Sequence, residues 1–209
     1  MSPDWPPWPL GRALRRRYDA AMWSSSTLEL AAPALLVAMP HLKDGPFAQA
    51  VVLLVQHDAQ GSMGLMLNQP TGVTLGDFGN SLGVDFGARG AEEVYMGGPV
   101  ENERAFILHD GPHRGPETTA VLPQVAMSFS MESLGALAKH PPQDLRVCIG
   151  YAGWGAQQLA QEIAQGAWMV ATPEPHFLFH TPPEQMWHAA LKEMGIEPLQ
   201  LMQKPTALN

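Results

Sequence analysis

Cysteine is nearly absent from this sequence, with Cys148 the only one among 209 residues. A single thiol excludes an intramolecular disulfide and a cysteine-rich zinc site. Charged residues are also scarce, at 15% of the chain, and 20 Asp and Glu face only 12 Lys and Arg. The resulting net charge of −8 disfavours binding to the phosphates of nucleic acids. We therefore expect no direct nucleic-acid binding.

Long apolar segments are absent as well. The longest apolar run covers residues 31–39 and contains Pro33, so it is too short to span a bilayer. Residues 5–9 consist of Trp and Pro and precede an arginine run, with no continuous apolar stretch after it, unlike a secretory signal peptide. We expect no membrane insertion and a reducing, cytoplasmic location.

Apolar residues make up 45% of the chain, which predicts a globular protein with a sizeable core. Residues 1–30 differ from the rest, because they carry four arginines against three carboxylates and no periodic apolar face. We interpret residues 1–30 as a flexible N-terminal arm and residues 31–209 as the folded domain. Met22 offers an alternative start, in which case residues 1–21 are an extension from an upstream start codon.

Several short segments beyond the arm carry the apolar pattern of strands. The segment at 49–57 has apolar residues on both faces, which predicts a central strand covered on both sides. A short turn at 58–61 is typical of a hairpin with the next strand. We also expect residues 93–96 and 104–109 to pair around the turn Gly97-Gly98-Pro99. The predicted strands are 34–39, 49–57, 62–68, 93–96, 104–109 and 145–151.

Helices are fewer. Thr74 predicts the cap of a short helix that includes Leu82, and Ser130 predicts a second helix that runs to Lys139. A third is expected within 154–168, and a fourth begins at a capping box over 181–184, with Trp187 in its apolar stripe. Strands outnumber helices and do not alternate strictly with them. The fold class predicted is α+β, a single compact domain with a mixed, mostly antiparallel central sheet covered by helices.

Motifs for nucleotide binding and for common hydrolases are missing from the sequence. Eight histidines raise the question of a metal, and His176 and His180 would share one face of a strand, but no carboxylate or cysteine supports them at a suitable spacing. Cys148 lies between apolar neighbours, which predicts an inert, buried thiol. We expect no metal and no cofactor.

Two glycine-containing segments are candidates for ligand binding. Paired glycines allow close backbone approach and an anion-accepting nest at the first, although a tight strand connection explains the same residues. The second joins a predicted strand to a helix start, where free N–H groups receive anions, although a strand-to-helix turn packed by its aromatic residues is the favoured explanation. The candidates in these segments are Met96, Gly97, Gly98 and Pro99, and Tyr151, Trp154 and Gly155.

Further candidates lie near these segments in the predicted sheet. Arg104 falls on the same strand face as Phe106, where a guanidinium either pairs with a nearby carboxylate or lines the edge of a cleft. His57 and His109 are the histidines best placed to act as a base. Asn68 is included because it ends a predicted strand.

Five motifs occur along the chain, LVAMP at 36–40, VVLL at 51–54, GSMGLMLNQP at 61–70, VYMGGPV at 94–100 and GYAGW at 150–154. Together they resemble the AlgH/YqgE family of bacterial proteins, over residues 30–196. The departures from the family pattern include Ala50, Ala105, Ala160 and the placement of Pro46, so chemistry that used Ser or Glu at those positions in relatives would be lost here. The resemblance implies a compact α+β fold and a cytoplasmic protein, and one branch takes its name from a regulatory effect.

The sequence thus favours a non-enzymatic binding or regulatory protein, with an indirect role in transcription, whose partner is a small anionic ligand or another protein. The alternative is a hydrolase or transferase with an anion site at the Gly97-Gly98 turn. In that case Arg104 would hold the substrate, and His57 or His109 would serve as the base.

Overall fold

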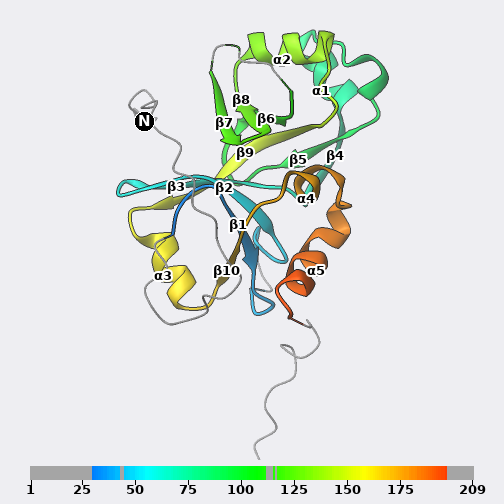
Figure 1. The fold of residues 1–209 in the computed structure, drawn as a ribbon. Coiled ribbons are helices and arrows are strands. Elements are labelled where there is room, and N and C mark those ends of the chain that lie inside the picture. The colour runs from blue at the N-terminus through cyan, green and yellow to red at the C-terminus, as the bar shows by residue number, and fades with distance from the viewer. Residues whose placement is uncertain (1–29, 43–44, 112–114, 116, 197–209) are drawn as a thin grey trace, which may run out of the picture.

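The computed structural model describes residues 30–42, 45–111, 115 and 117–196, so the predicted arm lies outside the described residues except for Leu30. Within these described residues, ten strands form one sheet in the order β10-β1-β2-β3-β9-β6-β8-β7, with β4 and β5 attached beside β9 (Figure 1). The strands are β1 Ala34–Ala38, β2 Val51–Asp58, β3 Gly61–Met66, β4 Pro70–Thr74, β5 Glu93–Met96, β6 Val100–His109, β7 Thr118–Leu122, β8 Val125–Ser128, β9 Leu145–Gly155 and β10 Trp168–Ala171.

Strand β9 organises the sheet, because it pairs with three other strands along its eleven residues. Its C-terminal half pairs with β3, and its N-terminal half lies between β6 and β5. The β5–β9 pair is parallel, and the other strand pairs are antiparallel. The α+β class with a mainly antiparallel sheet, as predicted, is therefore confirmed.

Strands β1 and β2 are buried on both faces, as the sequence predicted for β2. Leu35, Val37 and Leu53 face one apolar cluster, while Leu36 and Leu54 face another. Helices α4 (Pro175–His180) and α5 (Pro183–Glu193) cover the first cluster, and α3 (Gln158–Ala164) covers the second. In Figure 1, α4 and α5 lie together beside β1, on the side away from α3.

Two helices begin at the residues predicted from the sequence. Helix α1 (Leu75–Leu82) is capped by Thr74, whose hydroxyl accepts the N–H of Asp77. Helix α2 (Met131–Lys139) is capped by Ser130 in the same way. A short 3₁₀ turn, η1 (Gly87–Arg89), follows α1. Helices α1 and α2 contribute to a third apolar cluster, in which they pack against β5, β6 and β9.

The predicted pairing of β5 with β6 is wrong, because the two strands lie on opposite sides of β9. The chain between them crosses the β9 backbone instead of making a hairpin turn. A Cβ atom on Gly97 would collide with the carbonyl oxygen of Gly150, and one on Gly98 would collide with the backbone of Tyr151. The paired glycines are therefore required by this close crossing.

The helix predicted within 154–168 is shorter than expected, since Trp154 belongs to β9 and Trp168 to β10. Strand pairing with β3 extends β9 through Trp154, and the two indole rings then pack at 5.9 Å between centroids. The expected strand holding His176 and His180 is also wrong. Pro175 fits the first turn of a helix, and these residues form α4.

The capping box predicted for the last helix does not form. Helix α5 begins at Pro183 with Pro182 at the N-cap and no side-chain hydrogen bond there, because Thr181 ends α4. The apolar stripe of α5 is confirmed, and Trp187 is buried within it. Among the described residues, no helix is long and apolar enough to cross a membrane.

Candidate functional site

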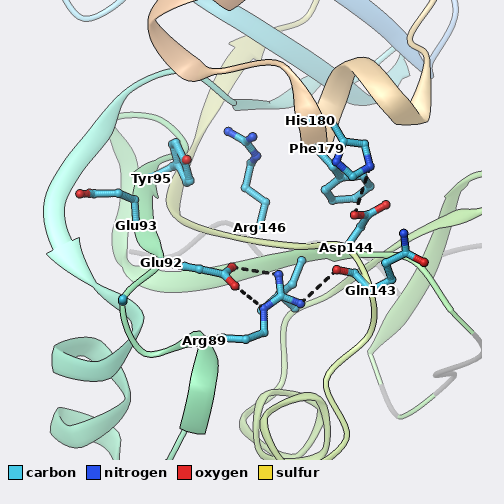
Figure 2. A pocket seen from close by; sticks show the side chains of 11 residues that line it. Arg89, Glu92, Glu93, Tyr95, Gln143, Asp144, Arg146, Phe179 and His180 are labelled. Atoms are coloured by element: carbon cyan, nitrogen blue, oxygen red, sulfur yellow. Dashed lines mark hydrogen bonds and ion pairs between the residues drawn. The ribbon is translucent and has the colours of Figure 1, made fainter.

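A cavity of about 460 Å³ opens between α4, the start of β9 and the segment from η1 to β5. Figure 2 shows its side chains, with Tyr95 on one side, Phe179 and His180 on the other, and Arg146 rising between them. A volume in this range suits a small-molecule ligand. None of the residues predicted from the sequence as ligand-binding lines this cavity.

Arg146 is the unusual member of this cavity, because it is a charged residue in the apolar strand β9 and only 5% exposed. Its guanidinium donates to the carbonyl oxygen of Leu67 and lies over the ring of Tyr95, 4.2 Å from the centroid. Among the described residues, no carboxylate forms an ion pair with it. A buried guanidinium is costly unless an anion or several acceptors compensate its charge. Arg146 is thus suited to hold an anion that enters the cavity.

The second arginine of the cavity, Arg89, is already occupied. It binds Glu92 through two parallel contacts, Nε–Oε1 at 2.7 Å and an Nη–Oε2 contact at 2.9 Å. It also donates to the carbonyl oxygen of Pro142 at 2.8 Å. Arg89 therefore ties η1 to the segment before β9, and its charge is neutralised by Glu92.

On the opposite wall, the imidazole of His180 lies 3.3 Å from the carboxylate of Asp144, from Nε2 to Oδ1. The rings of His176 and His180 are one helical turn apart, with 4.8 Å between centroids. Burial raises the pKa of the Tyr95 phenol above its usual value, although the nearby Arg146 acts in the opposite direction. Tyr95 is therefore a neutral hydroxyl at physiological pH. The described residues contain no group of three or more His, Cys, Asp or Glu arranged to hold a metal ion.

The glycine turn predicted as an anion nest lies elsewhere, against the backbone of β9. The N–H of Gly97 donates to the carbonyl oxygen of Ile149 at 2.8 Å, and the N–H of Met96 donates to Gln69. Gly97 and Gly98 are buried, whereas Met96 and Pro99 are exposed. The backbone donors of Met96 and Gly97 are thus already used by the sheet, and ligand binding at this turn stays a prediction.

Arg104 lies on β6 on the same side as Phe106, as its alternation predicted, with its guanidinium over the rings of Phe106 and Phe129 at 5.4 and 4.8 Å. It forms an exposed ion pair with Glu101 at 3.3 Å. This is the geometry of the structural alternative, and its role in ligand binding stays a prediction.

The predicted histidines are engaged in hydrogen bonds. His109 is fully buried, and its two ring nitrogens contact the carbonyl oxygen of Asp110 and the hydroxyl of Ser128, both at 2.9 Å. His57 is half-buried, and its Nδ1 atom lies 2.7 Å from the hydroxyl of Ser62. Both rings are positioned by the sheet, and neither lines the cavity.

Asn68 closes the loop before β2, because its side chain accepts the N–H of Val51 and donates to the carbonyl oxygen of Gln49. Tyr151, Trp154 and Gly155 lie within β9, so the strand-to-helix turn predicted there is wrong. Burial raises the pKa of Tyr151 above its usual value.

Trp154 and Trp168 share one acceptor, since both indole N–H groups donate to Oε2 of Glu162, at 2.9 and 2.8 Å. The N–H of Gly155 is taken by the side chain of Gln158. These contacts fasten α3 to the sheet. Ligand binding at Tyr151, Trp154 and Gly155 stays a prediction.

Cys148 is fully buried in β9, and burial raises the pKa of its thiol to about 12. The prediction of an inert, buried thiol is therefore confirmed. Arg146 is not among the residues predicted from the sequence, although a signal for it is present there. A lone arginine inside the apolar segment at 145–151 is expected to be buried, and a buried charge needs a compensating group.

Comparison with known proteins confirms the resemblance drawn from the sequence. The model of the AlgH-like family matches residues 35–199. A UPF0301 protein of Myxococcus xanthus is 42% identical over 173 residues, which covers 82% of this chain and 94% of the relative. The UPF0301 protein AlgH of Pseudomonas aeruginosa is 39% identical over 165 residues, covering 77% and 87% of the two chains.

Two solved structures have the same fold. The solution structure of AlgH from Pseudomonas aeruginosa gives a TM-score of 0.71 at 35% identity, covering 88% of this chain and all of that one. A crystal structure of protein DIP2367 from Corynebacterium diphtheriae gives a TM-score of 0.66 at 23% identity, covering 84% and 93%. The second likeness concerns the fold alone.

Proposed function

The chain belongs to the AlgH-like family, and we propose that it is a non-enzymatic binding protein with a regulatory role, whose ligand is a small organic anion. One observation carries the proposal: Arg146 places a buried guanidinium at the cavity, and no described carboxylate neutralises it. A buried, uncompensated charge in a strand lowers the stability of the ligand-free protein, and a bound anion would compensate that charge.

The enzyme alternative receives less support from the geometry. A general base needs a free nitrogen within reach of a substrate, in a cleft that admits it. His109 is buried with both ring nitrogens in contact with polar groups, and His57 contacts Ser62, which is itself buried. We therefore favour binding over catalysis for this chain.

Regulation in this proposal acts through the ligand or a protein partner, with any effect on transcription indirect. The net charge of −8 is unfavourable for contact with DNA phosphates. Occupation of the cavity by an anion would join α4 to β9 through Arg146 and so couple the ligand to the position of that helix.

The test is a thermal-shift measurement on the full chain in chloride buffer, with acetate, succinate, citrate, L-glutamate, sulfate and inorganic phosphate as separate probes. Saturation to about 100 times the Kd stabilises the folded state by about 2.7 kcal/mol. For a protein of this size, that free energy corresponds to a rise in Tm of roughly 5–10 °C.

The decisive variant is Arg146→Met, which keeps a long side chain and removes the guanidinium. Its matched control is Arg104→Met, which removes the same charge from an exposed ion pair. We expect Arg146→Met to abolish the shift and Arg104→Met to retain it. Loss of the shift only in Arg104→Met would instead place the anion at the glycine turn. If none of the probes raises the Tm, and calorimetry also detects no binding, the proposal is contradicted.

A further inference from the structure

The ionised side chains around the cavity divide into compensated and uncompensated groups. Arg89 and Glu92 neutralise each other through two contacts. Glu93 is exposed, and Figure 2 shows its carboxylate pointing away from Arg146. Two groups of opposite sign remain, Arg146 and Asp144.

The carboxylate of Asp144 is poorly compensated. Its side chain is 20% exposed, and its contact with His180 is 3.3 Å long. A charge-assisted hydrogen bond of this kind is usually about 2.7–2.9 Å. A neutral imidazole would donate one hydrogen bond and leave the negative charge in place. Asp144 can therefore accept a stronger, cationic donor.

Arg146 and Asp144 do not compensate each other, although Asp144 directly precedes β9 and Arg146 is the second residue of that strand. Asp144 lies in a bend before the strand, so the alternation along β9 does not set the direction of its side chain. The described contacts contain no ion pair between them. Figure 2 shows the guanidinium and the carboxylate directed apart, with Phe179 and His180 on the side of Asp144. A bound molecule with both charges could bridge them.

We infer that the cavity binds an amino-carboxylate, a small molecule with one carboxylate for Arg146 and one ammonium group for Asp144. This inference rests on the proposed function, since it names the class of ligand for the same cavity. The ring of Phe179, which Figure 2 shows on the Asp144 side of Arg146, lines the cavity and suits the apolar part of such a molecule. A zwitterion adds no net charge, whereas a phosphate dianion would meet the carboxylate of Asp144.

Isothermal titration calorimetry of the full chain provides the test. The probes are the common L-amino acids and the series glycine, β-alanine, 4-aminobutanoate and 5-aminopentanoate, which varies the distance between the charges. Each compound that binds is compared with the carboxylate lacking its amino group, such as butanoate or 3-phenylpropanoate. We expect removal of the amino group to raise the Kd at least roughly tenfold, as for a lost hydrogen bond to a charged group.

Asp144→Asn isolates the ammonium contact, because it removes the charge and keeps the shape and an oxygen facing His180. We expect this variant to raise the Kd of the amino-carboxylate to that of its deaminated analogue, whose own Kd stays unchanged. Glu93→Gln is the matched control, with the same change of charge on a side chain that points away, and it should bind as the wild type does.

The possible outcomes separate the two claims. If an amino-carboxylate and its deaminated analogue bind equally to the wild type, the inference is wrong and the anion site at Arg146 stands. The inference is equally wrong if simple anions bind and no amino-carboxylate does. If neither class of probe binds, both the inference and the proposed function fail.

Discussion

Trp187 provides the clearest quantitative test of how α5 is held on the sheet. Its side chain is 4% exposed within the main apolar cluster, and its indole N–H donates to the carbonyl oxygen of Ala38 at 2.7 Å. Truncation of a buried tryptophan to alanine costs about 3–5 kcal/mol. Since about 1 kcal/mol shifts Tm by roughly 2–4 °C at this chain length, Trp187→Ala should lower Tm by roughly 6–20 °C.

Trp187→Phe separates packing from hydrogen bonding, because phenylalanine keeps most of the apolar volume and has no donor. A buried acceptor left without its donor costs about 1–3 kcal/mol, so this variant should be intermediate. Urea unfolding followed by circular dichroism measures both changes. Gln185→Ala on the exposed side of α5 is the control and should change stability by less than about 0.5 kcal/mol. A loss below about 1 kcal/mol for Trp187→Ala would refute the placement of this helix.

Three other outcomes are expected. Glu162→Ala should lower the free energy of unfolding by about 2–4 kcal/mol, because two buried indoles lose their common acceptor, and Glu162→Gln should lower it less; a denaturant titration distinguishes them. The pKa of Cys148 is raised to about 12, while a thiol in the unfolded chain ionises at about 8.5. The free energy of unfolding should therefore be unaffected by this thiol below pH about 8.5 and should fall as the pH rises toward 12. The fall should be smaller in Cys148→Ala, and urea midpoints measured across this pH range would show the difference. Duplex DNA should bind no more tightly than micromolar at physiological salt, and a submicromolar Kd in a mobility-shift titration would overturn this expectation.

Local patterns in the sequence predicted much of the fold. The caps at Thr74 and Ser130 and the apolar run of β2 are properties of neighbouring residues, and each predicted the element that forms. The pairing of strands was harder, because β10 joins β1 from the other end of the chain. No nearby residue specifies that contact. The short strands β4, β7, β8 and β10 were not predicted either, although β7 and β8 pair with each other across the short connection at 123–124.

The candidate site was predicted less well than the fold. Glycines 97 and 98 have a strong local signature, but that signature reflects a crossing over β9, which is a contact between distant segments. Arg146 was visible only as an exception within an apolar strand. Its importance depends on which groups the fold leaves around it, and those come from Leu67 just after β3, from β5 and from α4.

Arg146 also permits a prediction about stability that separates a structural arginine from one kept for a ligand. If Arg146 mainly supports the fold, through Leu67 and Tyr95, then Arg146→Met should lower Tm. If it is kept for a ligand, the ligand-free protein bears the cost of a buried, uncompensated charge, and an apolar side chain of similar length removes that cost. Replacing buried charges by apolar residues is often neutral or stabilising by about 1–4 kcal/mol. We therefore expect Arg146→Met to have an unchanged or higher Tm in anion-free buffer and to lose the stabilisation by anions. A Tm lower by more than roughly 4 °C, equivalent to at least about 1 kcal/mol, would show that the guanidinium belongs to the framework of the fold.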